Sequence, residues 1–171
     1  LLSGTDDPDT ALSQSEFEPV WSIVRALRSH DGALGDALDG IRLSMGRKGG
    51  GGRPPIKIVL DLPKGVSRKF AGAFATRLVE RTTSSWNFNL GLLQNFVDRE
   101  GHARVPARHV ELFQGAEFRL GYWVSDKRSI FSNGMLSQQR IEALEAVSGW
   151  VWDGNEAIYQ EGLAALRAFV G

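Results

Sequence analysis

The sequence predicts a mainly α-helical protein, in which a three-helix bundle follows a helical connector with one short β-strand. Apolar residues recur at the three- and four-residue spacing of amphipathic helices through most of the chain. Only residues 56–62 form a convincing strand, because this run is short and β-branched. Four tryptophans fall within residues 84–153, where they can close a small core. With 171 residues, 42% of them hydrophobic, the chain is long enough to bury such a core.

The composition excludes several classes of protein. The sequence has no cysteine, which excludes a disulfide framework and every thiolate metal site and agrees with a cytoplasmic location. No apolar run approaches the roughly 20 residues of a membrane-spanning helix, so we expect no membrane partner. Residues 1–7 carry no positive charge ahead of an apolar stretch, so we do not expect a signal peptide.

The net charge of zero conceals an uneven distribution of charge along the chain. Residues 1–18 carry five acidic residues and no basic one, whereas residues 19–83 carry 12 basic and five acidic residues, a net charge of +7. Residues 84–153 are close to neutral, with seven basic and eight acidic residues. This asymmetry indicates a basic partner-binding surface. The alternative is a basic face that is only solvated.

The N-terminal half divides into a tether and a connector. Residues 1–16 are rich in Ser, Thr and Asp with little apolar periodicity, and we interpret them as a flexible tether. The connector, residues 17–83, begins with a helix near Pro19, a residue tolerated in a first helical turn. The predicted core stripe of this helix is Val20, Ile23, Val24 and Leu27, and that of the next is Leu34, Leu38, Ile41 and Met45.

A glycine-rich stretch, residues 46–55, interrupts the connector. It does not have the order of a Walker loop, because Lys48 precedes the glycines and no Ser or Thr follows it. We therefore expect a flexible, basic loop and a chain that neither binds nor hydrolyses ATP. After the strand at residues 56–62, Ser67 caps a helix in which Phe70 and Phe74 share a face.

Three helices are predicted between residues 84 and 153, each with its own end signal. The first begins at Trp86 and ends at Gly101, and the second runs from Leu120 to a stop at residues 133–134. Ser137 is a good N-cap for the third helix, which Gly149 closes. The residues on either side of this cap, Leu136 and Ile141, have the spacing of a hydrophobic staple.

The sequence motifs of this region are more specific than its hydrophobic periodicity. GHARVP at residues 101–106, LGYWV at 120–124 and GWVWD at 149–153 follow one another in the same stretch. Residues 84–153 resemble the helicase-associated domain, which occurs as tandem repeats behind the motor of bacterial superfamily-two helicases of the DEAD/DEAH-box type. One departure is the stretch between residues 109 and 120, which is longer than is usual in the family.

The resemblance implies a function for the chain. It implies a nucleic-acid-binding accessory region, a fragment without the motor, whose parent is an ATP-dependent helicase and whose partners are DNA or RNA and the motor. The fragment itself would not be an enzyme. The alternative is a protein-interaction or regulatory spacer that docks on the motor and binds no nucleic acid. The strand at residues 56–62 would pair with the motor, with a second copy in a dimer, or with a short strand not yet recognised.

An internal comparison supports a repeat. A shift of 73 residues aligns the apolar residues of the helix at 86–97 with those at 159–170. We therefore interpret residues 154–171 as the first helix of a truncated second repeat. The alternative is that any two amphipathic helices align in this way.

Basic and aromatic residues in the second helix and the turn before it are the candidate nucleic-acid contacts. Phosphate binding requires several cations on one face, and an exposed aromatic ring often adds a base contact. The candidates are Arg104, Arg108, His109, Arg119, Tyr122, Lys127 and Arg128. The alternative is that the cations pair with the neighbouring carboxylates. We interpret the tryptophans of the bundle as core residues rather than stacking platforms.

No catalytic or metal site is predicted. His102, His109 and Glu111 could bind zinc only in an unusual site without cysteine, and their spacing matches no zinc motif. The expected role of the His102 ring is a hydrogen bond to the backbone of its own loop. We therefore expect no metal and no cofactor.

Overall fold

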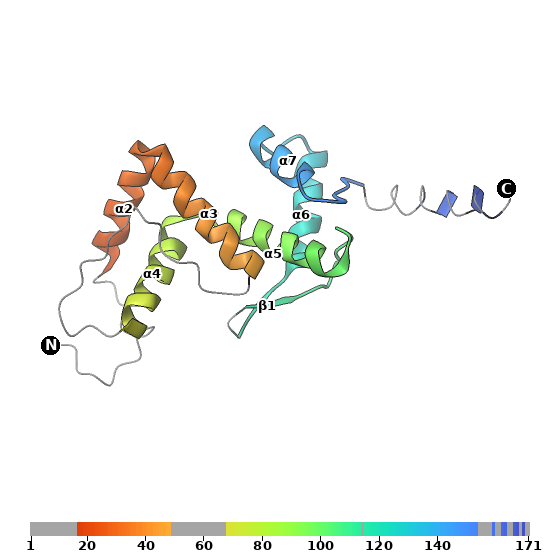
Figure 1. The fold of residues 1–171 in the computed structure, drawn as a ribbon. Helices are drawn as coiled ribbons and strands as arrows, with labels where there is room; N and C mark the ends of the chain where they lie inside the picture. The colour runs from red at the N-terminus through yellow and green to blue at the C-terminus, as the bar shows by residue number, and fades with distance from the viewer. Residues whose placement is uncertain are drawn as a thin grey trace. The chain divides into compact units, whose positions relative to one another are not determined.

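The computed structural model describes residues 17–48, 68–113 and 115–153, together with six positions after residue 158. The described residues are mainly helical, with six helices and one two-stranded antiparallel sheet, which confirms the predicted fold class (Figure 1). The chain divides into two compact units, Leu1–Gly91 and Leu92–Gly171. The strand predicted at residues 56–62, the tether and the glycine-rich loop from residue 49 on lie outside the described residues.

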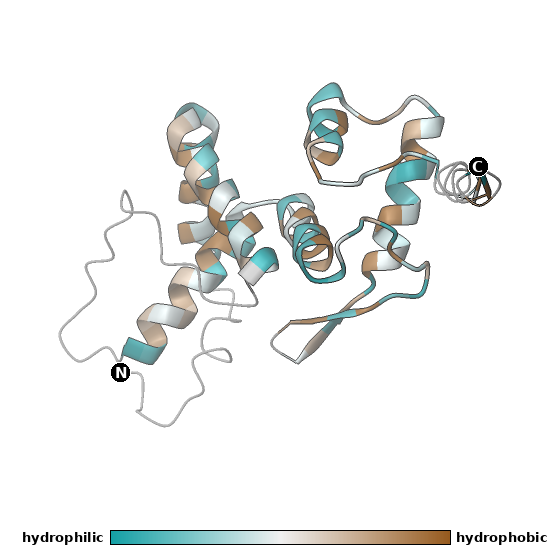
Figure 2. Ribbon diagram, turned by 45° about the vertical axis from the view of Figure 1, so that its right-hand side comes forward, coloured by the Kyte–Doolittle hydropathy of each residue, from teal (hydrophilic) through white to brown (hydrophobic). Residues whose placement is uncertain are grey.

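Three helices form the first unit: α2 (Glu18–His30), α3 (Gly32–Lys48) and α4 (Arg68–Thr82). Trp21 of α2 is buried, with its ring centroid 5.1 Å from that of Phe74 on α4. Leu38 and Met45 of α3 are also buried. Figure 2 shows apolar and hydrophilic segments alternating along these helices, as their amphipathic pattern requires.

The predicted core stripe of α2 is wrong. Ile23 and Leu27 are exposed, whereas Trp21 is the buried residue of the helix. The helix turns the large Trp21 ring inward, and Arg28, seven residues on, lies on the same side. Arg28 donates hydrogen bonds to the backbone oxygen of Thr82 (2.7 Å) and to Asp39 (2.5 Å). One arginine therefore links all three helices.

The helix α5 (Ser85–Glu100) begins in the first unit and continues into the second. Its first half packs on α3, because a Cβ atom at Gly91 would lie only 2.1 Å from the backbone oxygen of Leu43. The Arg42 guanidinium lies 4.5 Å from the Phe88 ring centre and 3.5 Å from a carboxylate oxygen of Glu80. Several cations of the connector are thus paired within the protein.

The second unit contains the rest of α5, the hairpin of β1 (Glu111–Phe113) and β2 (Ala116–Phe118), α6 (Leu120–Ser132) and α7 (Gln138–Glu145). In the hairpin, Leu112 is opposite Glu117. The core residues Leu93, Leu120, Val124 and Leu144 are almost completely buried. The three predicted helices are confirmed. The hairpin was not predicted, and it lies in the stretch that is longer than usual in the family.

Local signals account for the ends of these helices. Gly101, Gly134 and Gly149 follow α5, α6 and α7 and all have positive φ angles, which glycine adopts without strain. Ser137 occupies the N-cap position of α7 as predicted, but its side chain makes no capping hydrogen bond. Leu136, just before this cap, is buried.

The tryptophans of the bundle are half-buried and contact other side chains. The Trp152 ring stacks on Phe131 at a centroid distance of 3.7 Å, and Trp150 lies nearly perpendicular to Trp152 at 5.2 Å. The Trp152 Nε1–H group donates a hydrogen bond to Glu145. These contacts agree with their interpretation as packing residues.

The C-terminal segment is described only in part. Its described positions are helical, and Tyr159, Leu166 and Phe169 among them are exposed. The second repeat stays a prediction. No helix among the described residues is long and apolar enough to cross a membrane.

Candidate nucleic-acid interface

Four of the seven candidate residues line one open hollow of about 280 Å³ in the second unit. Arg108, His109, Arg119 and Tyr122 contribute to its wall, and Ala107 and Val110 complete it. They come from the loop after α5, from the residue before α6, and from the first turn of α6. Residues up to 15 positions apart in sequence therefore meet at one place.

Close packing of α6 against the preceding loop builds this hollow. The Gly121 N–H group donates a hydrogen bond to the His109 backbone oxygen (3.0 Å), and the His109 N–H group donates one to the Pro106 oxygen (2.9 Å). A Cβ atom at position 121 would lie 2.0 Å from the Pro106 oxygen and 2.6 Å from that of Ala107. Only glycine permits this approach, which sets Arg108 and Arg119 at the same hollow.

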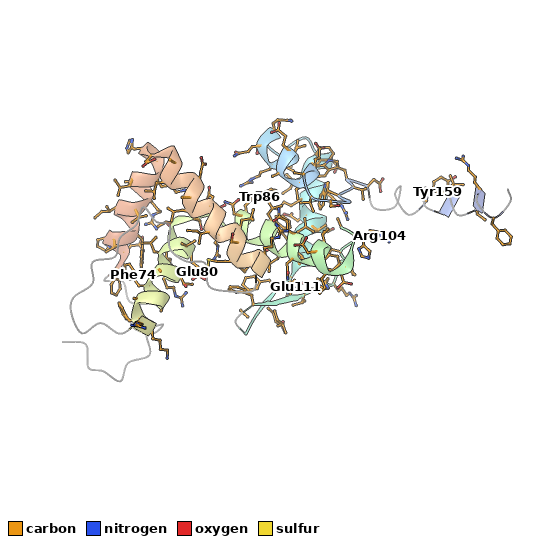
Figure 3. All side chains as sticks on the ribbon, in the orientation of Figure 1. Phe74, Glu80, Trp86, Arg104, Glu111 and Tyr159 are labelled. Atoms are coloured by element: carbon orange, nitrogen blue, oxygen red, sulfur yellow. The ribbon has the colours of Figure 1, made fainter. Side chains whose placement is uncertain are left out.

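A hydrogen bond to the buried Glu111 carboxylate holds the His109 ring. The His109 Nε2 atom lies 2.7 Å from a carboxylate oxygen of Glu111, and the ring meets Phe96 edge to face at 4.9 Å. The same Glu111 oxygen accepts a 2.7 Å hydrogen bond from Arg99. Burial raises the Glu111 pKa, but hydrogen bonds from Arg99 and His109 outweigh it, so the pKa lies below its ordinary value. Figure 3 labels Glu111 at the start of β1.

The two arginines of the hollow are exposed. Neither Arg108 nor Arg119 forms an ion pair with a carboxylate anywhere in the described part of the chain. Tyr122 is 70% exposed, and no other aromatic ring within the described residues packs on it. These three side chains are available to a ligand.

The other three candidates do not line the hollow. Arg104 is exposed in the loop after α5 (labelled in Figure 3). Lys127 is only 15% exposed at its side chain, with its Nζ atom 2.7 Å from Asp126 and 5.9 Å from the Trp123 ring centre. Its position matches the alternative of a cation paired with a neighbouring carboxylate.

Arg128 is held inside the unit. Its Nε–H group donates a hydrogen bond to the Val151 backbone oxygen (3.1 Å), and its guanidinium lies 5.0 Å from the Trp150 ring centre. Burial lowers the Arg128 pKa, and the nearby Asp153 charge opposes this shift. These contacts join α6 to the segment that follows α7.

His102 has the local role predicted for it. Its Nδ1 atom accepts a hydrogen bond from the Arg104 backbone N–H group at 3.3 Å. Among the residues that the structure describes, no group of three His, Asp or Glu side chains could hold a metal ion.

Sequence reasoning missed Gly121 and Val110. A signal for Gly121 exists, since a glycine inside an apolar helical pattern costs about 1 kcal/mol relative to alanine and often marks close backbone approach. Nothing comparable marks Val110, whose place in the wall depends on the fold of the loop.

The second unit is a small helical domain in which two exposed arginines and an exposed tyrosine meet at one hollow. Comparison with protein families identifies this domain: the model of the helicase-associated domain matches residues 83–153. This confirms the resemblance and makes the segment a helicase-associated, accessory region. Comparisons with curated proteins and with solved structures give no significant match.

Proposed function

We propose that the helicase-associated domain binds DNA or RNA through the hollow, with Arg108 and Arg119 as its phosphate contacts. The observation that carries the proposal is the pair of exposed arginines without carboxylate partners among the described residues, beside an exposed tyrosine. Guanidinium groups bind phosphate through paired, charge-assisted hydrogen bonds. His109 and Tyr122 would line the remainder of the site.

The remaining candidates have a smaller part in the proposal. Lys127 and Arg128 would have to give up contacts with Asp126 and Val151 before they could reach a phosphate. Arg104 is exposed and would add to the positive potential of the same unit. Phosphate contacts position the ligand and carry no sequence information, so little sequence preference is expected.

The proposal extends to the arrangement of the parent protein. Residues 17–83 would be a connector, residues 84–153 the domain itself, and residues 154–171 the first helix of a truncated second repeat. The parent would be an ATP-dependent helicase of the cytoplasm whose motor hydrolyses ATP while this region grips the nucleic acid. The second candidate function is a spacer that docks on the motor without binding nucleic acid. The ion pairs of the connector favour it, because they occupy cations that could otherwise contact phosphate.

Fluorescence anisotropy with labelled oligonucleotides over a range of salt concentrations tests the proposal. Each phosphate neutralised contributes about 0.9 to the log–log salt slope on duplex DNA and about 0.7 on single strands. Replacing Arg108 and Arg119 by alanine should therefore flatten the slope by about 1.4–1.8. The control is Arg140→Ala, an exposed arginine of α7 that does not line the hollow. Equal binding by the double variant and the parent at low salt would favour the spacer.

A further inference from the structure

We propose that the hollow accommodates a single unpaired nucleotide, so that the domain binds single strands in preference to duplexes. This inference rests on the proposed function and specifies its ligand. The base would stack against Tyr122, and the adjoining phosphate would contact Arg108 and Arg119.

The hollow is at the small end of the range of ligand sites, which limits its occupant to one small group. Its volume of about 280 Å³ lies just below the range of about 300–1,000 Å³ that is typical of small-molecule sites. A paired base is covered on both faces by its neighbours in the stack. Only a base that has left the stack can present a free face to a protein side chain.

The chemistry of the wall also matches a nucleotide. Tyr122 and Val110 provide exposed apolar surface for a base, and Arg108 and Arg119 provide charge for a phosphate. Purely phosphate-based binding would need the cations alone and gives no reason for a tyrosine that is 70% exposed. Base–aromatic stacking is the usual device by which proteins hold single strands without reading their sequence.

The acidic residue nearest to the hollow in sequence would not repel the ligand. Glu111 is buried, and its carboxylate already accepts hydrogen bonds from Arg99 and His109. The same contacts fix the His109 ring, so this part of the wall is formed before a ligand arrives.

The test compares three probes of equal length bound to the full chain: oligodeoxythymidine of about 12 nucleotides, the same strand with abasic residues throughout, and a duplex. The abasic strand keeps every phosphate and loses every base. We expect the parent to bind oligodeoxythymidine about 5- to 150-fold more tightly than the abasic strand, the range that stacking of one base gives. The duplex should bind more weakly than oligodeoxythymidine at the same salt concentration.

Variants of Tyr122 separate the inference from the proposed function. Tyr122→Phe keeps the ring and should keep the preference for oligodeoxythymidine, whereas Tyr122→Ala should reduce its binding to that of the abasic strand. Because this side chain is mostly exposed, both variants should melt like the parent. Equal affinity for all three probes, still dependent on Arg108 and Arg119, would overturn the single-nucleotide inference and leave the proposed function standing. Binding unaffected by the arginines would overturn both.

Discussion

Replacing Gly121 by alanine tests how the hollow is built. The new Cβ atom would lie 2.0 Å from the Pro106 oxygen and 2.6 Å from the Ala107 oxygen, both in the backbone. Cβ contacts under 3.0 Å are essentially never seen, so the loop must move by at least about 1 Å. This movement also strains or breaks the hydrogen bond from the Gly121 N–H group to His109.

The expected loss of stability follows from three contributions. Overpacking costs about 1–3 kcal/mol, and the lost hydrogen bond costs about 0.5–1.5 kcal/mol. Alanine recovers about 1 kcal/mol through its higher helix propensity. The net result is a fall of about 0.5–3.5 kcal/mol in the free energy of unfolding, measured by urea unfolding followed by circular dichroism.

A matched control isolates the close contact from the general effect of alanine. Gly72 lies in α4, and a Cβ atom there would meet nothing within 4 Å. Gly72→Ala should therefore raise the free energy of unfolding by about 0.5–1 kcal/mol. If Gly121→Ala proved as stable as the Gly72 variant, the close approach of α6 to the loop would be refuted.

Two further predictions concern buried charges. Glu111 has a lowered pKa in the folded protein, so its contribution to stability is complete above its ordinary pKa of 4.5 and is lost as the pH falls through the lower folded value. Glu111→Gln should lower the free energy of unfolding by about 1.5–3 kcal/mol at neutral pH, because its bonds to Arg99 are weaker. The variant's free energy of unfolding in urea should also depend less on pH below 4.5. The same pH dependence in variant and parent would contradict this prediction. Arg128→Ala should destabilise the protein by about 1–3 kcal/mol, because the Val151 oxygen loses its donor. Arg108→Ala, at an exposed arginine without an ion pair to a described carboxylate, should not. Equal melting of these two arginine variants would contradict the structural role of Arg128.

The helices of the second unit were predictable because their ends are marked locally. Gly101, Gly134 and Gly149 each follow a helix with a positive φ angle, and Ser137 precedes α7. Such signals require only a few neighbouring residues. They hold wherever the segment lies in the fold.

Neither the hairpin nor the buried face of α2 could be predicted, and the reasons differ. Each strand of the hairpin has only three residues, too short for a period of two to be recognised. The helix α2 is amphipathic, and its periodicity favours the face that carries Ile23 and Leu27, whereas the structure buries Trp21 at the edge of that face. The choice depends on Phe74 of α4, a contact between residues 53 positions apart.

The candidate site was predicted as a set of residue types, and the sequence carried no information on its geometry. Of the seven candidates, the structure places Arg108, His109, Arg119 and Tyr122 at one hollow and three cations elsewhere. What separates the two groups is the approach of α6 to the loop at Gly121, a tertiary contact. Neither charge nor spacing reveals which cations will keep a carboxylate or carbonyl partner.

The residues that shape the hollow differ from those proposed to contact the ligand, and this difference has a consequence for experiment. Gly121 and Glu111 shape the hollow from buried positions, so their substitution should reduce stability and binding together. Arg108, Arg119 and Tyr122 are exposed, so their substitution should reduce binding while the domain melts normally. A hollow whose wall is fixed by backbone hydrogen bonds and by the hydrogen bond of His109 to the buried Glu111 carboxylate needs little rearrangement to receive a ligand. Binding free energy is then not spent on ordering the site.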